Sequence, residues 1–149
     1  MSALSRRLLT FAVVVSLISL FPHGVTAQRQ TQFNAEDDLE PPKLSLTKAV
    51  MAEKVEGNVP ISQAVTFSVA MGQVCCFTSF EPVTQPTLVY HRWYHRDELS
   101  TQIRLRLYPP KWSTYSQIQL READKGPWRV EISDQNGHIF GVIRFSITD

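Results

Sequence analysis

The fold is decided by residues 88–107, which read LVYHRWYHRDELSTQIRLRL. Apolar and polar side chains alternate through much of this stretch, and successive side chains of a strand point to opposite faces of its sheet. The stretch therefore predicts a hairpin of two strands, residues 89–95 and 99–107. The second strand has an apolar face, with Leu99, Ile103, Leu105 and Leu107, and a polar face, with Gln102, Arg104 and Arg106.

The turn between these strands decides which side chains of the first strand join the apolar face. A two-residue turn at Arg96-Asp97 would place there Tyr90, Arg92 and Tyr94. A three-residue turn that also includes Glu98 would place there Val89, His91, Trp93 and His95. We expect the three-residue turn, because it buries Val89 and Trp93 and leaves Arg92 outside. Asp97 tolerates the left-handed backbone conformation that such a turn requires.

The rest of residues 44–149 repeats the pattern of short apolar runs between turn residues. Further strands are predicted at residues 46–55, 64–69, 74–80, 113–120, 128–133 and 139–147. Asn136-Gly137 supplies a hairpin turn before the last strand, whereas Gly57 and Pro60 interrupt the chain after the first. We predict one all-β domain, an immunoglobulin-like antiparallel β-sandwich of about seven to eight strands. Trp93 falls where such sandwiches bury a central tryptophan.

Residues 1–27 have the pattern of a secretory signal peptide. Arg6 and Arg7 precede an apolar run at residues 8–21, and Val25-Thr26-Ala27 suits signal peptidase. The run is shorter than the roughly 20 residues of a spanning helix, so we expect cleavage; an uncleaved anchor is the alternative. The mature protein is then exported, to a periplasmic or extracellular location, with no integral membrane span after signal cleavage.

Residues 28–43 are polar, include Glu36-Asp37-Asp38 and Pro41-Pro42, and are predicted to form a disordered linker. Removal of residues 1–27 takes away Arg6 and Arg7 and no acidic residue, which changes the formal charge from +1 to −1. Proteins that bind nucleic acids usually carry a strongly basic region. We therefore expect no nucleic-acid partner.

Cys75 and Cys76 are adjacent in the sequence. Their side chains point to opposite faces of the predicted strand, and a disulfide between neighbours would be strained. We expect one thiol to be buried as a small apolar group and the other to lie on the opposite face. A regulatory vicinal disulfide and a link to another chain are the alternatives.

The sequence predicts no catalytic residue, no cofactor and no metal site. His91 and His95 share a strand face but lie roughly 13 Å apart, too far to bind one ion together. Cys75 or Cys76 could pair with His91 as a nucleophile, but reactive thiols need accessible, electropositive surroundings and this segment is apolar. We therefore expect that the protein is not an enzyme and that His91 is a buried histidine bonded to backbone.

Three motifs occur in order along the second half of the domain. They are His91-Arg92-Trp93-Tyr94, Lys111-Trp112-Ser113-Thr114-Tyr115-Ser116, and Trp128-Arg129-Val130-Glu131 followed by Gly137. Residues 44–147 thereby resemble the bacterial domain-of-unknown-function family numbered 2914, although Tyr115 and Ile118 stand where that family often has Trp and Lys. The resemblance implies a compact β-sandwich of membrane-attached or exported proteins, and no reaction or cofactor.

Two groups of residues are candidates for a binding site. Alternation places on one exposed sheet face Tyr90, Arg92, Tyr94, Arg104 and Arg106. Interfaces favour Tyr and Arg, although a solvated sheet face is the simpler alternative. Trp112 and Tyr115 form an alternative aromatic site that could stack on sugar rings, unless they are core residues.

We therefore expect a non-catalytic interaction module that binds an unknown protein of the cell envelope. A carbohydrate-binding or cell-wall-binding module is the alternative, and a small hydrolase or thiol-redox protein is a third hypothesis. Burial of the Trp112 indole would disfavour the carbohydrate alternative, because only an exposed ring can stack on a sugar.

Overall fold

A computed structural model describes residues 43–149 of the chain. The signal peptide predicted at residues 1–27 lies outside the described residues, as does nearly all of the linker predicted at 28–43. Within residues 43–149, no helix is long and apolar enough to cross a membrane.

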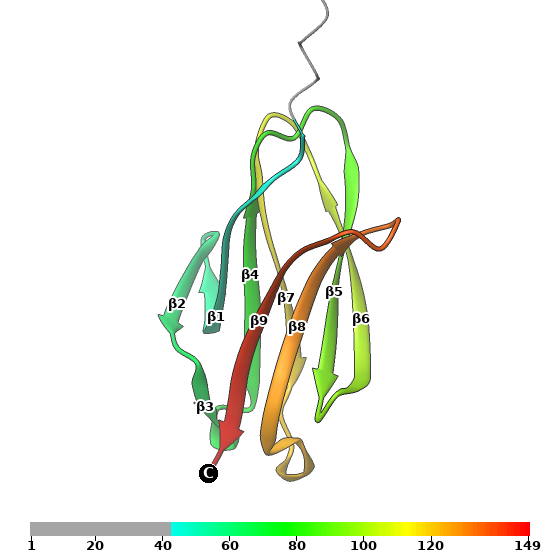
Figure 1. Ribbon diagram of the computed structural model, residues 1–149. Coiled ribbons are helices and arrows are strands. Elements are labelled where there is room, and N and C mark those ends of the chain that lie inside the picture. The colour runs from blue at the N-terminus through cyan, green and yellow to red at the C-terminus, as the bar shows by residue number, and fades with distance from the viewer. Residues whose placement is uncertain (1–42) are drawn as a thin grey trace, which may run out of the picture. The chain divides into compact units, whose positions relative to one another are not determined.

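The described residues form nine strands in two sheets (Figure 1). The four-stranded sheet has the order β2 (Val59–Gln63), β1 (Leu46–Glu56), β4 (Gln73–Phe80) and β7 (Trp112–Gln119). The five-stranded sheet has the order β3 (Thr66–Ser68), β9 (Ile139–Thr148), β8 (Gly126–Asp134), β5 (Thr87–His95) and β6 (Glu98–Leu107). Two 3₁₀ turns, Val69–Met71 and Glu122–Asp124, complete the elements. The predicted all-β sandwich is confirmed.

The strand number and one pairing differ from the prediction. The interruption after the first strand is a two-residue turn, Gly57-Asn58, whose positive φ angles of 53° and 62° close a hairpin between β1 and β2. The run predicted at residues 64–69 is the short strand β3, which pairs with β9 in parallel rather than antiparallel. Strand β2 was not predicted and raises the number to nine, whereas the parallel pairing of β3 was missed because its partner β9 lies far away in the sequence.

The β5–β6 hairpin has the shorter of the two turns that the sequence allowed, but most of its side chains lie on the faces expected from the longer turn. His95 pairs with Glu98, so the turn is the two-residue Arg96-Asp97, with φ angles of 48° and 68°, and the predicted three-residue turn is wrong. Ser100 is then an extra residue in β6, because Tyr94 pairs with Leu99 and Trp93 with Thr101. Such a bulge shifts the register by one residue.

The bulge restores the predicted faces along most of the hairpin. Val89 and Trp93 are buried, and Arg92 lies on the outer side. Leu99 precedes the bulge and therefore lies beside Tyr94, with 55% of its surface exposed, instead of joining the apolar face. The hydrophobic pattern thus determines the register of the long part of the hairpin but not the form of its turn.

The core lies between the two sheets. Trp93 is fully buried at its centre, and its ring meets Phe145 edge to face at 5.9 Å. Cys76 belongs to the same cluster, whereas Cys75 leaves β4 on the other side and is nevertheless fully buried. Both cysteines are free thiols. As predicted, one thiol, that of Cys76, lies in the core, and the other, that of Cys75, lies on the opposite face of β4, where it is also buried.

Candidate functional site

The outer face of the five-stranded sheet carries the predicted interaction residues. Side chains directly across from each other on paired strands lie on the same face. Tyr90 pairs with Arg104, and Arg106 pairs with Leu88, while Arg92 Nε donates a hydrogen bond to Gln102 Oε1 at 2.9 Å. The structure therefore brings together, on one face, Tyr90, Arg92, Tyr94, Arg104 and Arg106.

Strands β8 and β9 extend this face with residues that were not predicted from the sequence. Arg129 lies between Tyr94 and Arg144, and Glu131 lies beside Arg92. The alternation of residues 128–133 already places Arg129 and Glu131 outward, but no signal in the sequence reveals that β8 lies next to β5. We name this surface the arginine face, with members Tyr90, Arg92, Tyr94, Arg104, Arg106, Arg129, Glu131 and Arg144.

Part of the arginine face is held by contacts within it. The Arg129 guanidinium lies 4.0 Å from the centre of the Tyr94 ring, and its Nε donates to Glu131 at 3.1 Å. Arg129 also forms an ion pair with Asp97. Burial, then hydrogen bonding to Glu131, raises the pKa of Tyr94. Tyr94, Arg129 and Glu131 thus hold one another in a fixed orientation.

The arginine face carries an excess of positive charge. It has five guanidinium groups, on Arg92, Arg104, Arg106, Arg129 and Arg144, against the carboxylates of Glu131 and the adjacent Asp97. Among the described residues, Arg104, Arg106 and Arg144 are exposed and form no ion pair.

A depression of about 500 Å³ opens at one end of this face, and Tyr94, Arg96, Arg129 and Arg144 contribute to its lining. The geometry suits an acidic ligand.

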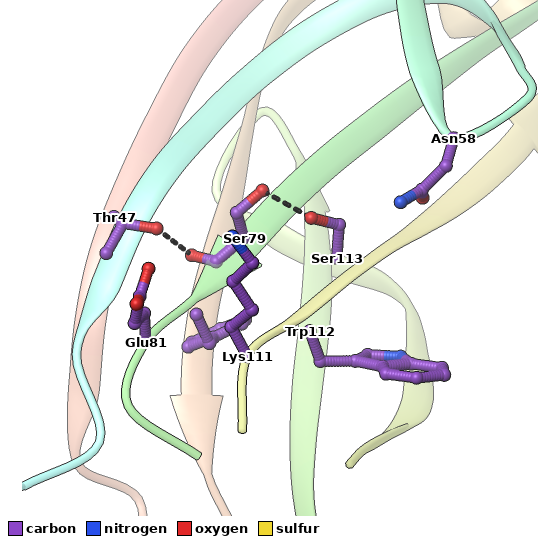
Figure 2. Close-up of a pocket in the computed structure, with 8 residues that line it drawn as sticks. Thr47, Asn58, Ser79, Glu81, Lys111, Trp112 and Ser113 are labelled. Atoms are coloured by element: carbon purple, nitrogen blue, oxygen red, sulfur yellow. Dashed lines mark hydrogen bonds between the residues drawn. The ribbon is translucent and has the colours of Figure 1, made fainter. Parts of the chain in front are cut away.

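A separate groove of about 580 Å³ lies on the four-stranded sheet and contains Trp112 (Figure 2). It is lined by Thr47, Asn58, Ser79, Phe80, Glu81, Lys111, Trp112 and Ser113. Trp112 is 38% exposed and stands where β7 begins, with its ring against Tyr108 at 4.9 Å. The exposure of the indole removes the objection to sugar stacking that burial would have raised.

Tyr115 does not share this groove. Trp112 pairs with Phe80, whose side chain is in the core, whereas Tyr115 pairs with Phe77. Tyr115 lies two residues beyond Ser113 on the same side of β7, and it is not one of the residues that line the groove. The two aromatics proposed together from the sequence are both exposed, but the structure does not join them into one site.

The groups with catalytic potential lie in the interior. His91 is fully buried, and its Nδ1 lies 2.8 Å from Ser116 Oγ while its Nε2 lies 3.2 Å from Thr78 Oγ1. Its partners are therefore side chains, and the predicted backbone partner is wrong. Burial lowers the pKa of His91 to about 4 and raises the pKa of both cysteines.

His95 has a different environment, since it stacks on Trp128 at 4.6 Å and its Nε2 lies 3.1 Å from Lys125 O. Within residues 43–149, no group of three or more His, Cys, Asp or Glu side chains is placed to hold a metal ion. The motif residues Trp93 and Trp128 are likewise buried, so Trp112 alone among the three tryptophans offers an exposed ring.

Residues 86–147 match the model of the family described as "Protein of unknown function (DUF2914)", which confirms the family resemblance over this part of the domain. No curated protein matches the chain.

Among solved structures, the chain is similar to a β-glucosidase from Kluyveromyces marxianus, with 12% identity and a TM-score of 0.40 over 72% of this chain and 14% of that one. It is also similar to the GH3 β-glucosidase of Bifidobacterium adolescentis, with 12% identity and a TM-score of 0.39 over 70% of this chain and 17% of that one. The chain thus corresponds to a small part of either enzyme, and these likenesses carry no information about activity.

Proposed function

We propose that this chain, whose residues 86–147 match family 2914, is an exported, non-catalytic module that binds an acidic segment of another envelope protein. The arginine face is the binding surface. The observation that carries the proposal is the depression of about 500 Å³ that Arg96, Arg129 and Arg144 line beside the Tyr94 ring. A cleft lined by several guanidinium groups attracts carboxylates, and the aromatic ring supplies contact area.

The chemistry of the face favours a carboxylate-bearing partner. A guanidinium group binds a carboxylate through two parallel hydrogen bonds, and charge complementarity accelerates association. Arg104, Arg106 and Arg144 are exposed and have no acidic partner among the described residues, so each is free to make such a pair. Arg129 is already oriented by Tyr94 and Glu131, which reduces the entropy that binding would cost.

Export and the absence of catalysis are parts of the same proposal. The signal-peptide pattern of residues 1–27 supports export. The buried positions of His91 and Cys76 support a non-catalytic role, because a substrate would not reach either side chain.

Photo-crosslinking in the cells that produce the protein tests the proposal. A photoreactive amino acid replaces Gln102, which is exposed on β6 directly across from Arg92, and in a matched control it replaces Gln119 on β7. We expect a discrete protein adduct from position 102 and none from position 119. Equal labelling from both positions, or no adduct from position 102, contradicts the proposal.

Charge reversal tests the chemistry of the partner. Arg144→Glu in the crosslinking background is expected to reduce the adduct about fivefold or more, because it repels an acidic segment from the depression. Lys48→Glu makes the same change of charge on the four-stranded sheet, outside the arginine face, and is expected to leave the adduct unchanged. If Arg144→Glu and Lys48→Glu give equal amounts of adduct, the arginine face does not recognise its partner through charge, and the proposal is contradicted.

A further inference from the structure

The groove on the four-stranded sheet is a second site, distinct from the arginine face. Its floor contains Ser79 on β4 and Ser113 on β7, which pair across the sheet and whose hydroxyl oxygens are 2.8 Å apart. Asn58 comes from the turn between β1 and β2, and Figure 2 shows it near the same end of the groove as Trp112. The groove thus gathers residues from four separate parts of the chain.

The walls of the groove are held in place by backbone hydrogen bonds. Val83 N donates to Pro110 O at 2.7 Å, which ties the β4–β5 connection to the loop that leads into Trp112. Glu81 N donates to Ser45 O at 3.0 Å, and the Thr47 hydroxyl donates to Ser79 O at 3.1 Å. A ligand therefore meets a formed surface rather than one that must be ordered first.

Polar side chains make up most of the lining, and one aromatic ring stands exposed among them. Hydroxyl, amide, carboxylate and ammonium groups are contributed by Thr47, Ser79, Ser113, Asn58, Glu81 and Lys111. This set contains both donors and acceptors, and the single positive charge is balanced by a single negative charge. Phe80, the other aromatic residue of the lining, is only 1% exposed, so Trp112 supplies the accessible apolar surface.

We infer that this groove binds a neutral saccharide, with one sugar ring stacked on the Trp112 indole. A sugar ring has an apolar face of C–H groups and a rim of hydroxyls that both donate and accept hydrogen bonds. The exposed indole matches the first feature, and the Ser79, Ser113 and Asn58 side chains match the second. The volume of about 580 Å³ lies within the range of small-molecule sites.

A peptide is a poorer match for the same groove. Peptide recognition draws its energy from apolar side chains inserted into pockets, or from an open sheet edge. The groove has little exposed apolar lining besides Trp112, and its floor is the face of the paired strands β4 and β7 rather than the outer edge of β7. The saccharide inference does not depend on the proposed function of the arginine face.

Titration of the intact protein with saccharides, followed by NMR, tests the inference. The chain has three tryptophans, so three indole N–H signals report on one exposed ring and two buried ones. The probes are cellotriose, chitotriose and maltotriose, each added to about 10 mM, which suffices to detect a millimolar Kd. We expect at least one of them to shift the Trp112 indole signal and to leave those of Trp93 and Trp128 in place.

Two matched variants identify the stacking ring. Trp112→Ala is expected to weaken binding about tenfold or more, because stacking and its buried area are lost. Tyr115→Ala removes an aromatic ring of similar exposure, 41% against 38%, outside the groove and is expected to leave the affinity unchanged. Circular dichroism of both variants verifies that the sandwich is intact.

Three outcomes would overturn the inference. They are no shift with any of the three saccharides, equal loss of binding in both variants, and a Trp112 shift produced by an acidic peptide but by no saccharide. Arg144→Glu keeps this test separate from that of the arginine face, since it should weaken partner binding and leave the saccharide titration unchanged.

Discussion

The buried His91 side chain makes the stability of the domain depend on pH. His91 lies on β5, and its two partners, Thr78 on β4 and Ser116 on β7, belong to the other sheet. The imidazole therefore connects the two sheets inside the core. We predict that acidification destabilises the fold mainly through this residue in the range from about pH 6.5 to 4.

The positions of the protons in this cluster follow from Trp93. Its indole N–H can only donate, and it donates to Ser116 Oγ at 3.1 Å. Ser116 then donates its own proton to His91 Nδ1, so the imidazole carries its proton on Nε2 and donates it to Thr78 Oγ1. The Thr78 hydroxyl in turn donates to Thr114 O at 3.5 Å. The neutral imidazole satisfies every group, and no acidic side chain takes part in this chain of bonds.

The magnitude follows from the two pKa values. The unfolded chain takes up a proton near the ordinary pKa of 6.5, whereas burial lowers the pKa of His91 in the folded state to about 4. Between these values the unfolded state binds more protons, so the free energy of unfolding falls as the pH falls. At about 1.4 kcal/mol per pKa unit, the difference amounts to about 3 kcal/mol of stability, fully present above pH 6.5 and lost as the pH falls through 4.

Urea unfolding at pH 7, 6, 5 and 4 measures this loss, with His91→Gln as the comparison. The glutamine side chain is neutral at every pH, so the variant is expected to be less stable at pH 7 but to lose about 3 kcal/mol less on acidification. Acidic residues contribute equally to both proteins and cancel in the difference.

Parallel pH profiles of the two proteins would refute the reasoning. If the variant does not fold, the NMR titration of His91 decides instead, since its ring signals should keep their neutral positions at pH 5.

Further predictions concern the thiols and the backbone. Because Cys75 and Cys76 are buried and their pKa values are raised, alkylation by iodoacetamide at pH 8 should be slow in the native protein and fast in urea; rapid native labelling would contradict this. Ser62 is exposed with a φ of 54°, so Ser62→Gly should raise the free energy of unfolding by up to about 1 kcal/mol. Gln63→Gly is the control and should lower it, because Gln63 lies in β2 with no positive φ. Trp93→Phe should cost about 1–3 kcal/mol in thermal or urea unfolding, since Ser116 loses a buried donor.

The sequence predicts well the features that depend on alternation within one strand. Burial of Val89 and Trp93 and the outward position of Arg92 follow from period-two patterning, which the sheet enforces because one face is apolar. The error at Leu99 has a local cause. The Arg96-Asp97 turn contains no glycine, so its left-handed conformations are not evident, and the compensating bulge at Ser100 leaves no signal in the hydrophobic pattern.

Features that depend on the order of strands in a sheet could not be predicted from alternation within one strand. Arg129 and Arg144 join the arginine face only because β8 and β9 follow β5 in the sheet. Asn58 joins the groove of Trp112 although the two are more than fifty residues apart, because the β1–β2 turn reaches the region where β7 begins. A motif read along one segment therefore identifies a candidate ring, such as Trp112, but not the groups that surround it.

The region of the family match is smaller than the unit that folds. Residues 86–147 contain β5, β6, β7, β8 and nearly all of β9, but they exclude β4. Without β4, His91 has no Thr78 to accept its proton, and the core around Trp93 lacks Val74 and Cys76.

The match also includes every guanidinium group of the arginine face, whereas the groove takes Thr47, Asn58, Ser79 and Glu81 from outside it. The family match therefore covers the whole arginine face but only part of the groove. A relative that matches over the same residues can be compared with this chain for the arginine face directly. It can be compared for the groove only if its preceding strands, outside the match, supply the same polar groups.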